Sequence, residues 1–267
     1  WSQRPPRSTL FPSPTPFRSS TGVVLTNGIT DDKRPTISGT AEVNSIVTVY
    51  IDGTAAGTVR SDGSGNWSFT PGSDLADGLH RITATATDTA GNTSGQTGAW
   101  NITVDTVAPG APVIVTIEDD VGSIKGNIDK NGFTDDKRPT LNGTAEANSL
   151  VTIYIDGKAV GSTRANGSGN WSFIPASDLA DGLHHISAKA SDAAGNSSGE
   201  AVTWDITVDT VISTPTIDTV YDNAGSKTGN VANGGKTDDT TPTLSGKAEA
   251  NSVVTIYDGS TKLGSVT

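Results

Sequence analysis

The chain has 267 residues, a net charge of −11 from 18 Lys+Arg and 29 Asp+Glu, three His, no Cys and no Met. The acidic balance argues against nucleic acid as a partner and against an anionic membrane, because phosphate binding needs clustered Lys and Arg. The lack of Cys excludes disulfides, thiolate metal sites and Cys nucleophiles. Apolar residues make up 33% of the chain, with 31 Gly, which favours turns and short half-buried strands over helices and membrane-inserting segments.

The N-terminal segment differs in kind from the rest. Residues 1–18 contain no acid, and they carry Arg4, Arg7 and Arg18 together with Pro at 5, 6, 12, 14 and 16. Such a composition cannot supply a core, so we predict that residues 1–19 form a disordered Pro/Arg-rich tail or a scar. The regular pattern begins near Ser20.

A repeated motif sets the domain organisation. The sequence TDDKRPT at 30–36 recurs at 134–140, and the same offset of 104 residues relates Trp67 to Trp171 and Trp100 to Trp204. A third copy opens at Thr237. A period near 100 residues is that of whole domains rather than of solenoid turns. We therefore predict a first repeat at 20–106, a second at 107–210 and a truncated third at 211–267.

Within a repeat, hydrophobic residues alternate with polar ones, which is the pattern of half-buried strands. Val151, Ile153 and Ile155 show this alternation, and Asp156-Gly157 is typical of a two-residue type I′ hairpin turn. About seven such runs occur within 107–210. This pattern predicts an all-β fold made of tandem seven-stranded antiparallel sandwiches of the immunoglobulin or fibronectin type III kind, with the two Trp of each repeat in the core.

Enzyme motifs are not supported by their context. The string GNSSG at 195–199 matches a nucleophile elbow, but that motif needs a strand followed by a helix, and this loop joins two strands. His80 and His184 are in phase with apolar neighbours, which predicts sandwich-edge histidines bonded to the backbone, whereas His185 is predicted to be exposed. We expect no catalytic activity.

Acidic residues are concentrated near the boundaries between repeats. Seven acids lie within 105–136, where only Lys125 and Lys130 oppose them. Crowded carboxylates repel one another, and Ca²⁺ relieves this by taking six to eight oxygen ligands in flexible geometry. The alternative is that these acids are solvated turn formers kept for solubility. The acids of the first boundary are Asp105, Glu118, Asp119, Asp120, Asp129, Asp135 and Asp136, and those of the second are Asp209, Asp218, Asp222, Asp238 and Asp239.

Several motifs in order carry a resemblance to a known family. The chain reads TDDxxPT, then GNWSF, LADGLH, DxAGN and VDT in each full repeat. It resembles the bacterial immunoglobulin-like repeats of giant adhesins, including the biofilm-associated proteins exported by type I secretion, over roughly residues 20–267. The resemblance implies β-sandwich repeats, a secreted or cell-surface location, and Ca²⁺ that stiffens the junctions between domains.

The resemblance also implies a set of cation ligands. For the junction between the first and second repeats these are Asp105, Asp119, Asp120, Asp135, Asp136 and Asp192. For the next junction they are Asp209, Asp222, Asp238 and Asp239. The first repeat lacks the segment DDVGS found at 119–123, so its cation site is predicted to be incomplete.

The sequence thus favours a structural role, as stalk or spacer repeats of a bacterial cell-surface adhesin that supports adhesion or biofilm formation. The expected partners are neighbouring repeats of the same chain and components of a host or biofilm surface. The alternative is a weak glycan-binding or protein-binding module that acts by avidity, through sandwich loops or Tyr50 and Tyr154.

Overall fold

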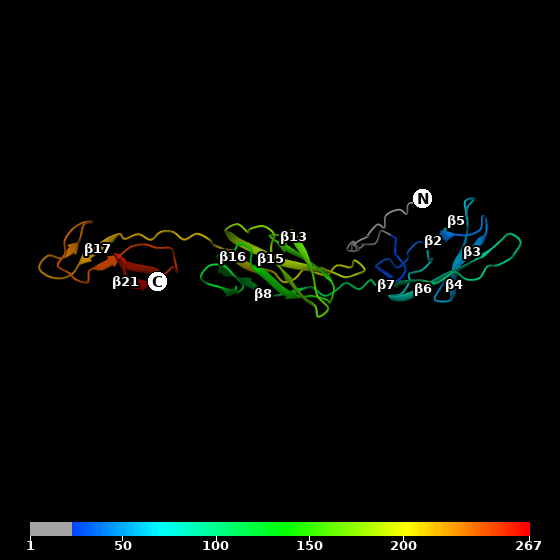
Figure 1. The fold of residues 1–267 in the computed structure, drawn as a ribbon, viewed down its shortest axis with the longest axis horizontal. Helices are drawn as coiled ribbons and strands as arrows, with labels where there is room; N and C mark the ends of the chain where they lie inside the picture. Colours follow the sequence, from blue (N-terminus) through cyan, green and yellow to red (C-terminus); the bar gives the residue numbers. More distant parts are fainter. Residues whose placement is uncertain (1–22) are drawn as a thin grey trace, which may run out of the picture. The chain divides into compact units, whose positions relative to one another are not determined.

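The computed structural model describes residues 23–267 (Figure 1), and the chain divides between Asp209 and Thr210 into two compact units. The prediction for the tail at 1–19 lies outside the described residues. All of the regular secondary structure within 23–267 is β, which confirms the predicted class. No helix in this part of the chain has the length and apolarity to span a membrane.

The second repeat is a complete two-layer sandwich. One sheet has the order β10-β16-β15-β12-β13 and the other has the order β14-β11-β8-β9. All neighbours are antiparallel except β10 and β16. Seven strands have four or more residues, and β9 and β10 are shorter. The strands are β8 (Val113–Asp119), β9 (Gly126–Asn127), β10 (Gly132–Thr134), β11 (Thr140–Thr144), β12 (Leu150–Ile155), β13 (Lys158–Arg164), β14 (Asn170–Phe173), β15 (Gly182–Ser191) and β16 (Trp204–Val208).

The core of the second repeat follows from the alternation in its strands. Val151, Ile153 and Ile155 of β12 are all buried, whereas the polar residues between them are half-buried. They pack against Ile117 and Leu141 of the opposite sheet, which are completely buried. Each such side chain contributes about 1.5–3 kcal/mol through the apolar surface it removes from water. This layer-to-layer contact holds the two sheets together.

The predicted Asp-Gly turn is present between β12 and β13. Asp156 and Gly157 have φ of 53° and 75°, the pair of positive values that a type I′ turn requires. The same turn recurs in the first repeat at Asp52 and Gly53, with φ of 52° and 80°. Glycine has no Cβ and adopts this backbone freely, so the dipeptide fixes the hairpin register locally.

The first repeat reproduces only one of the two sheets in full. Its five-stranded sheet has the order β1-β7-β6-β3-β4, but the second layer is a two-stranded sheet of β2 and β5. Within the described residues, no strand takes the place that β8 has in the second repeat. The strands are β1 (Gly28–Thr30), β2 (Ile37–Thr40), β3 (Ile46–Ile51), β4 (Thr54–Arg60), β5 (Asn66–Phe69), β6 (Gly78–Thr87) and β7 (Trp100–Val104).

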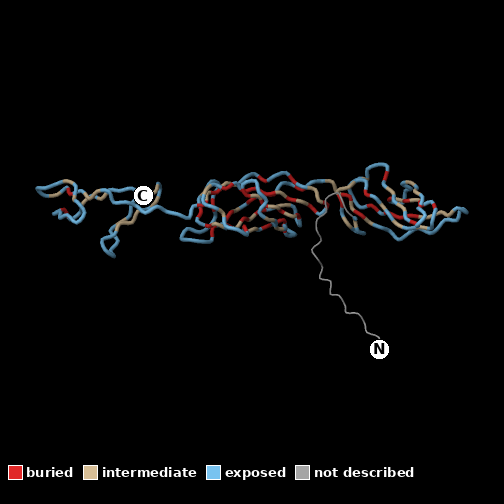
Figure 2. Tube along the Cα trace, turned by 90° about the horizontal axis from the view of Figure 1, so that it is seen from above, coloured by how far each residue is buried: buried red, intermediate tan, exposed pale blue. Residues whose placement is uncertain are grey.

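The unit Thr210–Thr267 contains the beginning of a third repeat. It has a three-stranded sheet of order β18-β17-β19 and the hairpin β20-β21. Buried positions run along the strands of the first two repeats, whereas this unit is mostly exposed or half-buried (Figure 2). Its strands are β17 (Thr219–Asp222), β18 (Gly229–Asn230), β19 (Thr243–Ser245), β20 (Val254–Asp258) and β21 (Thr261–Val266).

Candidate metal centre

The strand directions place the predicted acids at two opposite ends of the second repeat. Strand β15 runs from Gly182, which pairs with Val208, to Ser191, which precedes Asp192. Ten residues in a strand span about 30 Å, so the two ends are separate sites. We call the end that carries five acids the acidic pole and residues 192–198 the Asp192 loop. The acidic pole consists of Asp119, Asp120, Asp135, Asp136 and Asp209.

Thr134 links the carboxylate of Asp119 to the backbone of Asp136 at the acidic pole. The Thr134 hydroxyl donates to Asp119 Oδ2 at 2.6 Å, and its oxygen, Oγ1, accepts from the backbone N–H of Asp136 at 3.0 Å. The carbonyl of Thr134 accepts from the backbone N–H of Asp209 at 2.9 Å. The end of β10 therefore holds three acids from three different segments in one place.

The buried carboxylates are bonded to backbone N–H groups rather than to cationic side chains. Asp119 Oδ1 accepts from Val121 N at 3.0 Å, and Asp136 Oδ1 accepts from Arg138 N at 2.7 Å. Asp119 and Asp136 are only 8% and 4% exposed. The ion pairs formed among residues 23–267 include neither of them. Two carboxylates are thus largely removed from water without a neutralising charge, and hydrogen bonds compensate for this cost.

Each buried acid of the acidic pole has an exposed acid next to it in the sequence. Asp120 and Asp135 are exposed, and within the described part of the chain their carboxylates accept no hydrogen bond. Gly122, at φ +60°, packs its backbone directly against the Asp135 carboxylate, so a Cβ at this position would overlap Asp135 Oδ2. The turn at 120–122 is thereby folded over the acidic pole.

The third repeat builds the same arrangement at its own end. Thr237 donates to Asp222 Oδ2 at 2.6 Å, and Asp239 N donates to Thr237 Oγ1 at 3.0 Å. Gly225 packs against Asp238 as Gly122 packs against Asp135. Hydrogen bonds from the backbone N–H groups of Thr241 and Asn223 hold the pKa of Asp239 below its usual value. The same contacts therefore recur in two copies of the motif.

The Asp192 loop occupies the other end of the second repeat. Asp192 is buried, and its Oδ1 accepts from the backbone N–H groups of Gly195 and Asn196 at 2.8 and 2.9 Å. The Asn196 side chain then donates to the backbone carbonyl of Asp105 at 2.8 Å. Asp105 follows β7, and its N–H donates to the Thr30 carbonyl at 2.9 Å. This end therefore meets the last residues of the first repeat.

The structure therefore divides the six acids that the sequence interpretation assigned to one junction. Asp105 and Asp192 meet at the boundary between the first and second repeats, whereas the other four lie at the acidic pole with Asp209. Asp222, Asp238 and Asp239 lie together at the corresponding end of the third repeat. The sequence interpretation grouped the six by closeness along the chain, whereas β8 ends at Asp119 beside Thr134, at the end of the sandwich opposite to Asp105.

Two acids of the first repeat were missed. Asp31 and Asp32 are the counterparts of Asp135 and Asp136, and they follow β1, beside Asp105. Asp31 Oδ1 is buried without a hydrogen-bond partner in the described structure. The offset of 104 residues was the signal that could have identified both. Within 23–267, no three Asp, Glu or His side chains come together closely enough to form a metal-binding group.

The donor chemistry of the acidic pole fits a hard cation. Its groups are carboxylates and backbone carbonyls, which suit Ca²⁺ better than the imidazole and thiolate that softer metals prefer. The buried histidines are committed elsewhere: His184 Nδ1 lies 2.7 Å from Asp156 Oδ2, and its Nε2 lies 2.8 Å from the Ala180 carbonyl. The predicted backbone bond of His184 is confirmed, and the exposed position of His185 is confirmed as well.

The two-layer sandwich of the second repeat, with the matching five-stranded sheet of the first, is an immunoglobulin-like arrangement in tandem. The family model described as bacterial Ig-like domain matches residues 14–106 and 111–210, and the chain belongs to this family. The resemblance stated from the sequence motifs is thereby confirmed. No match is found among curated proteins.

Several solved structures are similar to the chain. The fibronectin(III)-like modules of Clostridium thermocellum CbhA are 18% identical with a TM-score of 0.42, over 71% of this chain and 92% of that one. A tetra-tandem repeat from the extending region of a large adhesion protein is 24% identical with a TM-score of 0.31, over 72% and 50%. The BSP domain of a biofilm associated protein is 19% identical with a TM-score of 0.26, over 70% and 29%. The chain spans half or less of the last two structures.

Proposed function

We propose that the chain is a segment of a calcium-stiffened stalk in a bacterial cell-surface adhesin, where it acts as a spacer in adhesion or biofilm formation. Membership of the bacterial Ig-like family and similarity to repeats of a large adhesion protein and a biofilm associated protein support this proposal. A secreted or surface location is part of the same proposal. The role is mechanical and involves no catalytic step.

One observation carries the calcium part of the proposal. Asp119 and Asp136 are buried and have no cationic side chain as partner, and Thr134 bonds the carboxylate of the first and the backbone N–H of the second. Asp222, Thr237 and Asp239 repeat this arrangement. Burying a charge is tolerated when a partner or a metal compensates it. A bound cation at each such pole would supply that compensation.

The acids of the acidic pole would bind such a cation in two different ways. Asp120 and Asp135 have carboxylates free of hydrogen bonds within the described residues, so they would ligate through both oxygens. Asp119 and Asp136 use one lone pair of each oxygen on protein donors and retain others. Ca²⁺ suits this mixed set, since it accepts irregular oxygen geometry, whereas Mg²⁺ demands near-octahedral geometry.

The mechanical consequence follows from the position of Asp209. This residue is attached to Thr134 through its backbone N–H and ends the first compact unit. A cation shared by Asp209 and the other acids of the acidic pole would fix the start of the connection to the next repeat. Without it, small contacts between domains leave relative rotation largely free. The same reasoning applies to Asp105, which follows β7 beside Asp31 and Asp32.

The expected partners are neighbouring repeats of the same chain, and host or biofilm surface components for the assembled adhesin. The alternative, a weak glycan-binding or protein-binding module acting by avidity, has less support from the exposed faces. Tyr154 is half-buried, and Lys189 Nζ lies 5.6 Å from its ring centroid, so this ring does not offer an open stacking surface.

Thermal unfolding and small-angle scattering of the full chain, in Ca²⁺ and in EDTA, test the proposal. We expect Ca²⁺ to raise the melting temperature by several degrees and to stiffen the particle, because a ligand that binds only the folded state stabilises it. The variant Asp135→Asn should reduce this difference. Asp178→Asn, which changes an exposed acid of the same repeat outside the pole, should leave it unchanged.

Identical curves in Ca²⁺ and EDTA would reject the calcium-dependent stalk. A Ca²⁺ effect that Asp178→Asn and Asp135→Asn reduce equally would reject the acidic pole as its origin, since general screening of charge would then explain it.

A further inference from the structure

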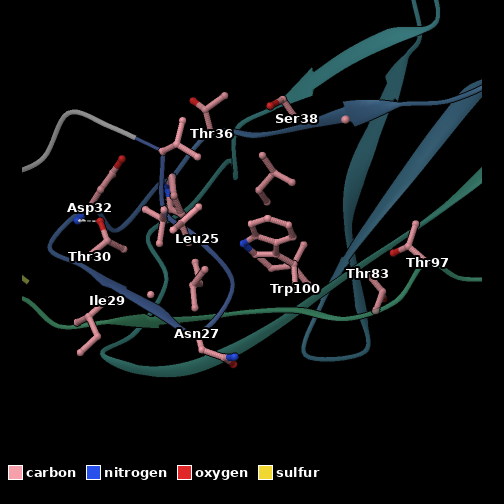
Figure 3. Close-up of a pocket in the computed structure, with 18 of the residues that line it drawn as sticks. Leu25, Asn27, Ile29, Thr30, Asp32, Thr36, Ser38, Thr83, Thr97 and Trp100 are labelled. Atoms are coloured by element: carbon pink, nitrogen blue, oxygen red, sulfur yellow. Dashed lines mark hydrogen bonds between the residues drawn. The ribbon is translucent and has the colours of Figure 1, made fainter. Parts of the chain in front are cut away.

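An apolar groove lies in the first repeat between β2 and the five-stranded sheet. It has a volume of about 1400 Å³, and the Trp100 ring projects into it from β7, with Ser38 of β2 across from it (Figure 3). Trp100 is 45% exposed, which is unusual for a Trp at a position that alternation assigns to the core. The apolar side chains of the lining are Val24, Leu25, Ile37, Trp67, Ile82 and Trp100.

The second repeat shows what such a groove holds. There, β8 pairs with β11 and places Ile114 and Ile117 in the core, so that Leu141 is completely buried and Trp171 is 4% exposed. The first-repeat counterparts of these last two residues, Ile37 and Trp67, are only half-buried. Among residues 23–267, the groove is therefore left without the strand that β8 provides in the second repeat.

A glycine in each repeat marks the path of that strand. A Cβ on Gly143 would overlap the carbonyl oxygen of Val113 in β8, and a Cβ on Gly246 would overlap the carbonyl oxygen of Thr216, which precedes β17. The counterpart in the first repeat is Gly39, where the nearest atoms are those of the Trp67 ring at 2.7 Å. Position 39 is thus also a residue without a side chain, which would allow a strand backbone to lie against it, although no strand within the described residues does so.

The backbone of β2 is open on the same side. β2 pairs with β5 through Ile37 to Thr40, and its other edge has no partner within the described residues. In the second repeat the corresponding edge of β11 bonds to β8. An open edge beside an apolar groove is the arrangement that accepts an added strand.

We propose that this groove binds the segment Thr216–Asp222, which includes β17, from a second copy of the chain, and so joins copies by strand exchange. The segment has Ile217 and Val220 at the spacing of Ile114 and Ile117. Ile217 is 70% exposed and Val220 is half-buried, whereas both β8 residues are buried in their own sandwich. The third repeat therefore loses less buried surface by releasing its strand than the second repeat would, and β17 gives up only short pairings with β18 and β19.

The pairing between β8 and β11 predicts the register of the exchanged strand. Asn142 pairs with Thr116 and Leu141 pairs with Ile117, so Ser38 should face Thr219 and Ile37 should face Val220. In this register Ile217 lies over Gly39, as Ile114 lies over Gly143. The interaction uses backbone bonds and apolar side chains, so it does not depend on a cation.

Disulfide trapping between two single-Cys chains tests the proposal directly, because the native chain has no Cys. One full-length chain carries Ser38→Cys, and a second, labelled by mass, carries Thr219→Cys. After mild oxidation of the mixture we expect about tenfold more mixed dimer than from Ser38→Cys with Thr261→Cys, since a disulfide forms only when the Cα atoms approach within about 7 Å. Thr261 lies exposed in the same repeat as Thr219 but on β21.

A peptide of residues 214–223 provides the second measurement. It should compete with the mixed dimer and quench or shift Trp fluorescence from the groove, and a peptide with Ile217→Asp and Val220→Asp should do neither. Equal cross-linking with Thr219→Cys and Thr261→Cys would overturn the proposal. Peptide binding without preferential cross-linking would overturn the second copy as the occupant.

Discussion

The first and second repeats share a motif order but differ in one layer. Each has a five-stranded sheet with the same order and register, and the second sheet is complete only in the second repeat, where β8 covers Leu141 and Trp171. The counterparts Ile37 and Trp67 remain half-buried. The five-stranded sheet therefore forms its pairings without β8, whereas the burial of side chains between the two layers depends on β8.

The largest expected difference concerns the residue beneath β8. Leu141→Ala should destabilise the second repeat by about 3–4 kcal/mol, because it opens a cavity in a closed core. Ile37→Ala should cost the first repeat about 1 kcal/mol, since its side chain is already partly in water. Hydrogen exchange of β12 and β3 amides reports the two repeats separately. Equal losses would mean that the first groove is filled in solution.

Calcium removal should also affect the two repeats to different extents. The second repeat carries the complete acidic pole, and the first lacks the counterpart of the turn at 120–122 within the described residues. At a Ca²⁺ concentration about a hundredfold above the dissociation constant, binding adds about 2.7 kcal/mol. EDTA should therefore accelerate hydrogen exchange in β15 far more than in β6. Equal acceleration in both strands would contradict a pole-specific site.

The two equivalent glycines provide a third contrast. Gly143→Ala should cost about 2–3 kcal/mol, because the new Cβ meets the rigid backbone of β8 at Val113. Gly39→Ala meets the Trp67 ring, which has room to move toward the groove, so the cost should stay below about 1 kcal/mol. Urea unfolding of each variant, followed by hydrogen exchange, measures both. A larger loss for Gly39→Ala would show that Trp67 is held in place.

The smallest expected effect concerns an element that the repeats share. His80 Nδ1 lies 2.7 Å from Asp52 Oδ2, as His184 Nδ1 lies from Asp156 Oδ2. Burial lowers the pKa of His80, but the Ala76 carbonyl and Asp52 together raise it above 6.5. Burial raises the pKa of Asp52, but the Arg81 N–H and His80 bring it below 3.8.

These shifts predict how the stability of the first repeat depends on pH. A raised folded pKa makes the His80 contribution complete below pH 6.5 and lost as pH rises through the folded value. A lowered folded pKa makes the Asp52 contribution complete above pH 3.8 and lost as pH falls through the folded value. Urea unfolding should thus show a small loss of stability as pH rises above 6.5, which Asp52→Asn removes. An unchanged slope in that variant would assign the loss to another group.

The sequence by itself determined the local features of this protein. The alternation around Ile153, the Asp156-Gly157 turn, the backbone bond of His184 and the repeat offset all follow from interactions within a few residues or from simple repetition. Turn sterics and the two-residue period of a strand act over that range, so a pattern in the chain is sufficient to predict them.

Only the tertiary structure decided which acids share a site and which core is closed. Asp119 lies far from Asp105 because β8 runs along the sandwich between them. Asp209 lies beside Thr134 because β16 is parallel to β10. The half-buried positions of Ile37 and Trp67 likewise reflect a strand absent from the first repeat within the described residues, since their counterparts Leu141 and Trp171 are buried. Strand direction and pairing between distant segments set these contacts, and local sequence does not encode either of them.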